Sequence, residues 1–170
     1  TSVKIISKGH RNPQGLYVDG SLILSTEHGP YGGDEINKII LGKNYGWPIA
    51  SYGDNYKFEI GKQNYKYKKN HLNNGFEEPI YSFVPSIGIS EITKIPNTFS
   101  KYWQDNYFVG SLNGGSLFRI KFNKNFDKIV FLEKIALLQR IRDITFIENL
   151  NSFALAMEDY GEIWLIKSSN

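Results

Sequence analysis

The stretch that decides the fold runs from 106 to 121 and reads NYFVGSLNGGSLFRIK. Two runs of alternating apolar and polar residues flank the turn sequence NGG at 113–115, and this pattern predicts a β-hairpin. Similar pairs of runs surround the DG turn at 19–20 and the DYG turn at 159–161. Because short runs with a two-residue period fill most of the chain, the sequence predicts an all-β fold.

Each of these hairpins belongs to one copy of an internal repeat, and each copy has three predicted strands. The strands are expected at Gly15–Val18, Leu22–Thr26 and Glu35–Ile39, at Ser90–Ile95, Tyr107–Leu112 and Leu117–Lys121, and at Arg142–Ile147, Phe153–Glu158 and Ile163–Lys167, with fourth strands at Pro79–Phe83 and Ile129–Leu132. Leu117 corresponds to Ile163, 46 residues later. A period of about 40 to 50 residues is typical of a four-stranded propeller blade.

We therefore expect one partial β-propeller domain over residues 1–170. About three four-stranded blades are expected, at roughly 9–84, 85–135 and 136–170. A polar segment at about 51–78 interrupts the first blade and has no periodicity of its own, which predicts a loop insert.

Closed propellers need about four to eight blades, so three blades predict part of a ring. The chain begins with Thr1 and its only methionine is Met157, which we interpret as a sign of further residues upstream. The alternative is a complete small sandwich of about ten strands.

Composition excludes several classes of protein. The 41% of hydrophobic residues in a chain of 170 is enough to bury a core. A net charge of +3 does not indicate strong polyelectrolyte binding, and although Tyr52–Tyr67 interleaves aromatic residues with lysines, we expect no nucleic acid. No apolar run approaches the roughly 20 residues of a membrane span. The chain has no cysteine, so it has neither disulfides nor thiolate metal sites.

Arginine is scarce in this lysine-rich chain and occurs at Arg11, Arg119, Arg140 and Arg142. A planar, always-charged fork suits carboxylates and developing negative charge. Arg11 and the Arg140/Arg142 pair precede the first strands of two repeats, and in a propeller such segments converge on the central channel. This favours a ligand with several carboxylates. The alternative is that Arg140 and Arg142 pair with surface acids such as Asp143.

The glycine-rich turn EHGPYGGDE at 27–35 ends in two carboxylates. Hard cations such as Ca²⁺ take carboxylates and backbone carbonyls together, so this segment is a candidate metal site, although the same pattern also suits a simple turn. His10, His28 and His71 are not at metal-ligand spacing, which argues against zinc. No Gly-x-Ser-x-Gly nucleophile motif is present.

Six segments together resemble the soluble glucose/sorbosone dehydrogenases. They are GHRNPQGL at 9–16, EHGPYGGDEIN at 27–37, GKNYGWP at 42–48, VPSIGIS at 84–90, GSLNGGSLFRI at 110–120 and RIRD at 140–143. Members of this family are six-bladed propellers that use pyrroloquinoline quinone (PQQ) and Ca²⁺ to oxidise aldose sugars. The resemblance covers nearly the whole chain and corresponds to the C-terminal half of that fold.

The resemblance implies roles for the arginines. Arg11 and Asn12 correspond to the cofactor-facing pair, with Arg11 placed to stabilise the reduced quinone oxygens and Gln14 nearby. Arg140 and Arg142 correspond to the pair that grips the PQQ carboxylates.

The resemblance also implies metal ligands. Gly29 and Pro30 would offer backbone carbonyls to the calcium that polarises the quinone. Glu35, Tyr45 and Asp54 fall where the family binds further, structural calcium.

Tyr81 would approach the sugar, but the chain departs from the family at three points. Asn113 stands where the family places a lysine against PQQ, and Val84 stands where an aromatic residue often occurs. The family's general base is a histidine in an upstream His-x-x-Gly-Arg motif, which this chain lacks. Abstraction of the C1 hydroxyl proton needs that base within hydrogen-bond reach.

We therefore expect a C-terminal fragment of a quinoprotein sugar dehydrogenase that is inactive by itself. Its expected partners are an aldose sugar, an external electron acceptor and the missing N-terminal half of the propeller, with a homodimer as a further option. The resemblance implies a periplasmic or secreted location. The rival hypothesis is a non-catalytic propeller binding module, or a half-ring that needs a partner chain; Asn113 in place of lysine favours it.

Overall fold

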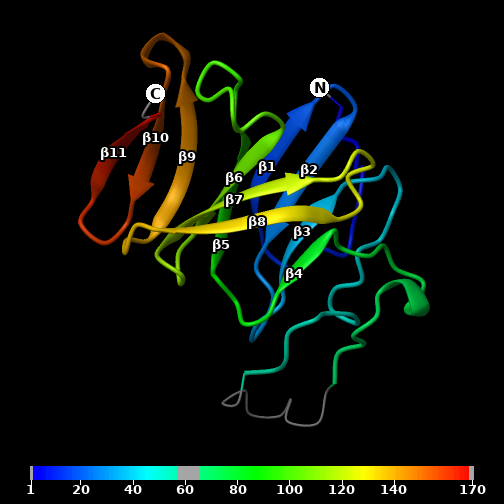
Figure 1. Ribbon diagram of the computed structural model, residues 1–170. Coiled ribbons are helices and arrows are strands. Elements are labelled where there is room, and N and C mark those ends of the chain that lie inside the picture. The colour runs from blue at the N-terminus through cyan, green and yellow to red at the C-terminus, as the bar shows by residue number, and fades with distance from the viewer. Residues whose placement is uncertain (1, 57–65, 169–170) are drawn as a thin grey trace. The chain divides into compact units, whose positions relative to one another are not determined.

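The computed structural model describes residues 2–56 and 66–168, and these form an all-β protein (Figure 1). The described strands make three antiparallel sheets. The first contains β1 (Pro13–Asp19), β2 (Leu22–Glu27), β3 (Asp34–Lys38) and β4 (Tyr81–Phe83), the second β5 (Ile89–Lys94), β6 (Asn106–Ser111), β7 (Ser116–Phe122) and β8 (Ile129–Ala136), and the third β9 (Ile141–Ile147), β10 (Ser152–Met157) and β11 (Glu162–Lys167). Short 3₁₀ turns lie at Leu72–Asn74 and Glu148–Leu150.

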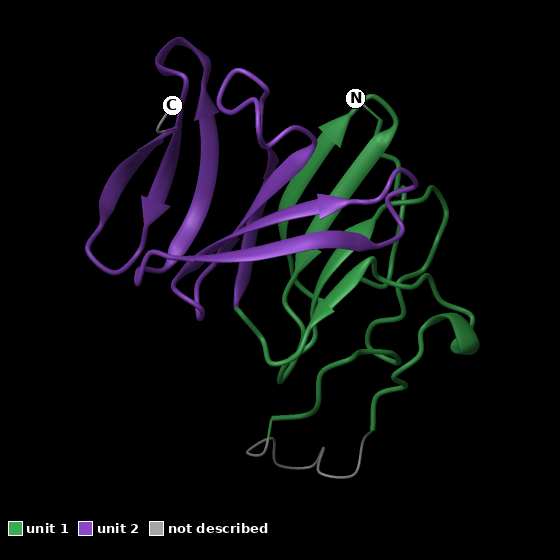
Figure 2. Ribbon diagram, in the orientation of Figure 1, with its two compact units in different colours: residues 1–87 green, residues 88–170 purple. Residues whose placement is uncertain are grey.

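Strand order follows chain order in every sheet, as expected for consecutive hairpins. The strands expected from the two-residue period are confirmed, with ends that differ by at most four residues. The chain divides into two compact units, residues 1–87 and 88–170 (Figure 2). The first unit contains the first sheet, and the second unit contains the other two. In the described part of the chain the third sheet has three strands.

The first unit buries polar residues in the inner strands of its sheet. The last four residues of β2 and the first four of β3 are all buried, which includes Glu27, Asp34, Glu35 and Asn37. The antiparallel register places Glu27 directly opposite Glu35. Like charges directly opposite on neighbouring strands destabilise a sheet, so this pair needs compensation from its surroundings.

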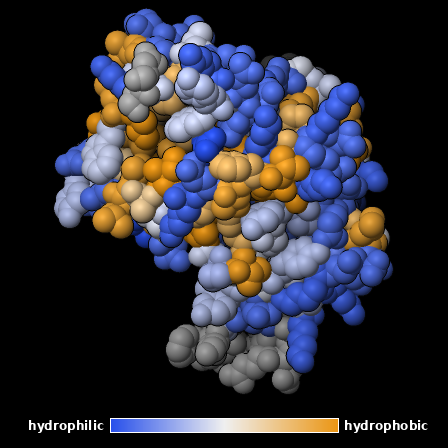
Figure 3. Space-filling view, in the orientation of Figure 1, coloured by the Kyte–Doolittle hydropathy of each residue, from blue (hydrophilic) through white to orange (hydrophobic). Residues whose placement is uncertain are grey.

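The second unit has an aromatic core between its two sheets. The Phe153 ring centroid lies 4.9 Å from Phe99 and 5.0 Å from both Phe108 and Phe146. Phe153, Phe99 and Phe108 are at most 1% exposed. The contacts of Phe153 with Phe99 and Phe108 are edge-to-face, a geometry that adds to the stabilisation from burial itself. On the visible face, apolar side chains gather over β8 (Figure 3), where Val130, for example, is 56% exposed.

The predicted loop insert at 51–78 lies partly outside the described residues, since 57–65 are not described. The described part has no strand, in agreement with its lack of periodicity. A parallel bridge between Ala50 and Lys68 nevertheless joins the insert to the preceding segment of the first unit. Within the insert, His71 is only 1% exposed. Among the described residues, no helix has the length and apolar character needed to cross a bilayer.

Candidate cofactor and cation site

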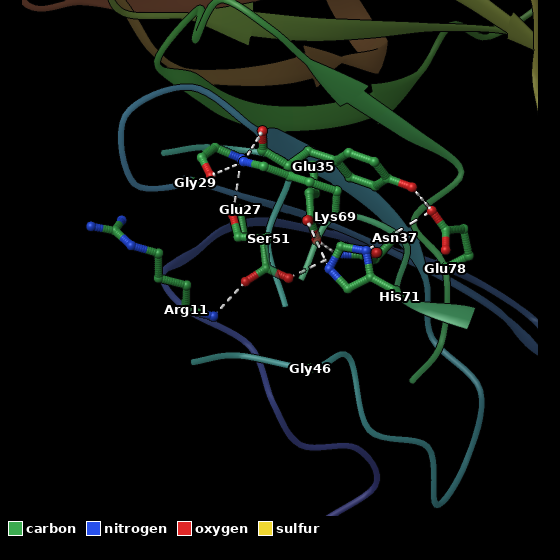
Figure 4. Close-up of polar contacts among 12 residues, drawn as sticks. Arg11, Glu27, Gly29, Glu35, Asn37, Gly46, Ser51, Lys69, His71 and Glu78 are labelled. Carbon is green, nitrogen blue, oxygen red and sulfur yellow. Dashed lines mark hydrogen bonds and ion pairs between the residues drawn. The ribbon is translucent and has the colours of Figure 1, made fainter. Parts of the chain in front are cut away.

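Glu27 is the centre of a buried polar cluster in the first unit. Its Oε1 accepts a hydrogen bond from Asn37 Nδ2 at 2.7 Å and lies 3.0 Å from His10 Nδ1. Its Oε2 accepts a 2.6 Å hydrogen bond from the backbone N–H of Arg11. Figure 4 shows the carboxylate between Arg11 and Asn37, with the Arg11 guanidinium extending away. Glu27 therefore holds the segment that carries Arg11 against β2.

Glu35 is the second buried carboxylate of this cluster. Its Oε2 accepts a 3.2 Å hydrogen bond from Asn37 Nδ2, so one amide bridges Glu27 and Glu35. His71 Nε2 lies 3.6 Å from Glu35 Oε1, and His71 Nδ1 lies 3.9 Å from Glu78 Oε1. The Asn37 amide carries no charge, so it satisfies hydrogen bonds of the two buried carboxylates without balancing their negative charge.

Burial and neighbouring charge shift the protonation of this cluster. Burial, together with the charge of Glu27, raises the pKa of Glu35 from 4.5 to about 8. Burial lowers the pKa of His71, so this imidazole is neutral at neutral pH. Glu35 consequently carries a proton at neutral pH unless a cation lies beside it.

This proton predicts a pH dependence of stability. In a chelator, the free energy of unfolding is expected to fall as pH rises from about 4.5 to about 8, because over this range the folded chain keeps the Glu35 proton and the unfolded chain has lost it. The slope reaches up to about 1.4 kcal/mol per pH unit and ends above a pKa of about 8. Urea unfolding between these values should show this slope in the wild type and little of it in Glu35→Gln. Exposed Glu162→Gln serves as control; parallel slopes in all three proteins would contradict the assignment.

A small cavity of about 10 Å³ opens beside these carboxylates. This volume is about the lower limit for one water molecule. The residues that line it are Gly9, Arg11, Glu27, His28, Gly29, Gly33, Glu35, Tyr45, Trp47, Ala50 and Ser51. The cavity thus combines two carboxylates with the glycine-rich turn, which are the donor types that hard cations prefer.

The turn at 29–33 keeps two carbonyls outside the backbone hydrogen-bond pattern. Neither Gly29 nor Pro30 accepts a backbone hydrogen bond from a described residue. Asp34 shapes the turn, because its Oδ1 accepts from the Gly29 N–H at 3.2 Å and its Oδ2 accepts from Ser86 Oγ at 2.7 Å and the Ile87 N–H at 3.0 Å. The two predicted carbonyl donors are therefore compatible with a bound cation.

Arg11 retains hydrogen-bonding capacity. Its NH1 donates to the His28 carbonyl at 3.2 Å, and its guanidinium carbon lies 5.2 Å from the Trp47 ring centroid. Its buried Nε has no acceptor among the described residues. An unsatisfied buried donor is costly, so Arg11 is suited to a ligand oxygen that accepts this hydrogen.

Asn12 and Gln14 lie together beside Arg11. Gln14 Nε2 donates to Asn12 Oδ1 at 2.9 Å and to two backbone carbonyls, and the contact is exposed. Tyr81, the predicted sugar contact, lies on β4, is 37% exposed and packs edge-on against Phe83.

The second unit brings Arg140 and Arg142 together on a single carboxylate. Glu158 accepts a 3.1 Å hydrogen bond from Arg140 Nε and another bond from Arg142 NH2. Arg140 NH2 is also 3.0 Å from Glu158 Oε1, and the Arg140 backbone N–H donates to Asp159 Oδ2 at 2.9 Å. Both arginine side chains stay roughly half exposed, at 42% and 51%. One carboxylate cannot use all the donors of two forks, so donors remain for a further anion.

The remaining predicted residues are in different surroundings. Asn113 lies in the tight turn between β6 and β7. The Tyr45 hydroxyl donates to the Lys38 carbonyl and accepts from the Ile40 N–H at 3.0 Å. Asp54 is 77% exposed and binds Lys69. Glu35 and Tyr45 share the small cavity, but Asp54 does not line it, and the described residues contain no cluster of three or more His, Asp or Glu suited to a metal ion.

A larger cavity of about 590 Å³ lies in the second unit and contains none of the predicted site residues. Its walls include Phe99, Trp103, Leu137 and Ile166, with Lys101 also lining it. It is an apolar recess continuous with the aromatic core.

Comparisons with known proteins agree with this fold. A family model for glucose/sorbosone dehydrogenases matches residues 1–165. Aldose sugar dehydrogenase YliI of Escherichia coli K12 is 33% identical over 98% of this chain and 44% of that protein. A crystal structure of a glucose dehydrogenase aligns with a TM-score of 0.82 and 32% identity over 98% of this chain and 47% of that one.

A more distant structure, the PQQ-bound aldose sugar dehydrogenase of Streptomyces coelicolor, aligns with a TM-score of 0.61 and 22% identity over 89% of this chain and 38% of that one, which supports the fold alone. The three antiparallel sheets are thus part of a β-propeller of the dehydrogenase class. The chain belongs to the glucose/sorbosone dehydrogenase family. It spans less than half the length of the relatives that it matches.

Sequence reasoning did not single out several members of the buried cluster. Asn37 and Glu27 lie within the quoted EHGPYGGDEIN motif, and the two-residue spacing between Glu35 and Asn37 could have indicated that these two share a face. His71 and Glu78 lie in the insert, where no periodic pattern could have indicated burial.

Proposed function

We propose that the whole protein oxidises aldose sugars at C1, with PQQ and Ca²⁺ as cofactors. Family membership supports a sugar dehydrogenase of this type. The names of two relatives describe an aldose sugar dehydrogenase and a PQQ-bound aldose sugar dehydrogenase. When bound, PQQ would supply the hydride acceptor for C1 of the sugar, and Ca²⁺ would polarise the cofactor.

Arg11 is the residue whose geometry carries this proposal. Glu27 fixes its backbone and Trp47 lies beside its guanidinium, while the buried Nε keeps a donor without an acceptor in the described chain. A fixed cation with an unused donor stabilises negative charge that develops on a ligand oxygen. Asn12 and Gln14 supply neutral amides at the same edge.

Arg140 and Arg142 are proposed to hold the carboxylates of PQQ. Glu158 keeps the two forks side by side and offsets one of their two charges. The remaining N–H donors can bind an anion through charge-assisted hydrogen bonds. Asn113 would contribute an amide where the family resemblance implies a lysine, which predicts weaker binding at that point.

Gly29 and Pro30 are proposed to bind Ca²⁺ through their carbonyls. Neither carbonyl accepts a backbone hydrogen bond from the described part of the chain, which supports this role. Glu35 and Tyr45 remain candidates for further calcium at the small cavity, and Tyr81 for the sugar contact. The protonated carboxyl group of Glu35 would give up its proton to bind a cation.

The proton acceptor for the C1 hydroxyl is proposed to lie outside this sequence. We expect this chain alone, with PQQ, Ca²⁺ and glucose, to reduce no dye acceptor, and the whole protein to do so. Dye reduction by the chain alone would contradict the assignment of the base. We further propose an external electron acceptor, an exported location and assembly with the remaining half of the propeller.

Arg142→Ala is expected to weaken PQQ binding by about ten- to a hundredfold in the whole protein, because one or two charge-assisted hydrogen bonds are lost. Arg142 is 51% exposed, so its removal should leave the fold intact. Absorbance titration with PQQ measures the affinity. Lys134→Ala removes an equal charge from the exposed strand β8 and serves as control. Equal affinities for the two variants would favour the rival, a non-catalytic binding module.

A further inference from the structure

The Lys69 ammonium contacts three oxygen atoms of the turn at 52–54, and we call this set of oxygens the cage. Its Nζ lies 2.6 Å from the Gly53 carbonyl oxygen, 3.2 Å from the Tyr52 carbonyl oxygen and 2.7 Å from Asp54 Oδ1. Two carbonyls and one carboxylate are the donor set that a hard cation takes in proteins. The Lys69 ammonium therefore occupies the place between these three oxygen atoms where a hard cation could bind.

Backbone hydrogen bonds position Lys69 beside this cage. Ser51 donates from its N–H to the Lys68 carbonyl at 3.0 Å, and Lys68 donates to the Ile49 carbonyl at 3.0 Å. These bonds lay the Lys68 segment parallel to residues 49–51. Lys69 follows directly and reaches the turn at 52–54.

The turn at 52–54 in turn supports the glycine-rich turn at 29–33. Tyr31 and Asp54 exchange backbone hydrogen bonds of 2.8 and 2.9 Å. A Cβ on Gly53 would lie only 2.1 Å from the Gly32 carbonyl oxygen and 2.9 Å from Pro30 Cδ. The two turns are thus in direct backbone contact, and a cation that orders one of them also supports the other.

We propose that the Lys69 ammonium is a built-in cation that takes the place of a metal ion at the 52–54 turn. Asp54 then forms an ion pair with Lys69 and is not a calcium ligand, in contrast to the role that the family resemblance implies. Removal of the ammonium exposes a site for a divalent cation. The proposal concerns metal content and stability, and it can hold or fail whatever reaction the protein catalyses.

Lys69→Met tests the proposal through thermal unfolding in a chelator and in millimolar CaCl₂. The variant is expected to melt a few degrees below wild type in the chelator, and to gain more from calcium than wild type does. In Lys69→Met/Asp54→Asn this extra gain should disappear, because the only carboxylate of the cage is lost. Lys68→Met removes a neighbouring exposed lysine and should respond to calcium like wild type.

Terbium luminescence gives a second readout, since Tb³⁺ replaces Ca²⁺ and is excited through nearby tyrosines. Lys69→Met should bind one Tb³⁺ more than wild type, and the double variant should not. A Lys69→Met protein with the calcium response and Tb³⁺ stoichiometry of wild type would overturn the proposal.

Asp54→Asn alone keeps the test decisive if Lys69→Met does not fold. Asp54 is 77% exposed, so this variant should fold. Its calcium-induced shift in melting temperature should equal that of wild type if Lys69 is the resident cation. A clearly smaller shift would show that Asp54 binds calcium and would overturn the proposal.

Discussion

Replacing Glu27 by alanine is expected to lower the free energy of unfolding by about 3–5 kcal/mol, the usual cost of breaking a buried, hydrogen-bonded charge. Glu27 is 3% exposed and accepts hydrogen bonds from Asn37 and from the Arg11 backbone. Its loss leaves buried donors without acceptors. Urea unfolding measures the change. Glu162→Ala, at an exposed position with one tryptophan contact, should cost far less; a similar cost at both sites would contradict the role of Glu27.

Glu27→Gln separates the charge of this residue from its shape. The amide keeps the size of the side chain and one acceptor oxygen. Because the charge of Glu27 contributes to the raised pKa of Glu35, the variant should lower the pKa of Glu35 toward its ordinary value. The fall in stability with rising pH should then end at a lower pH than in wild type. An unchanged end point would mean that burial alone raises the pKa of Glu35.

Gly33→Ala is expected to cost about 2–5 kcal/mol, the sum of a left-handed backbone and a steric clash. Gly33 has φ +74°, and a Cβ there would lie 2.2 Å from the Gly53 backbone nitrogen. The turns at 29–33 and 52–54 would have to separate. We expect this variant also to lose calcium affinity, because the Gly29 and Pro30 carbonyls lie in the displaced turn.

Gly42→Ala is the matched control for the Gly33 substitution. Gly42 has a nearly equal φ of +78°, but a Cβ at this position would meet no atom of the described residues within 4 Å. Its replacement should therefore cost only the left-handed conformation, about 1–2 kcal/mol. Denaturant unfolding of the two variants side by side measures the difference. Equal costs would show that the approach to Gly53 is not tight.

The repeated strands could be predicted because each is short and local. In β10, for example, SFALAM alternates between the two faces of its sheet and is bounded by turn residues. The scarcity of arginine and the position before a predicted strand singled out Arg140 and Arg142, and the family resemblance implied that they act as a pair. Their shared partner is Glu158, just after the end of the neighbouring strand, whereas the alternative from the sequence named Asp143 as an example of a surface partner. Partner choice depends on how strands register, which spacing along the chain does not specify.

The buried cluster shows the same limit. Nothing in the composition of the 51–78 insert distinguishes His71, which is buried, from the exposed residues around it. Its burial results from the packing of the insert against β3. The proximity of Lys69 to the 52–54 turn likewise depends on two backbone hydrogen bonds across the insert.

The amino-acid sequence by itself determined the all-β class, the strand repeat and the family, because these properties reside in local periodicity and in short sequence motifs. Only the tertiary structure decided which carboxylates face each other, which arginines share a counter-ion and which cation fills the turn beside Asp54. Those outcomes depend on distances between segments far apart in the chain, and desolvation and Coulomb energies vary steeply with such distances.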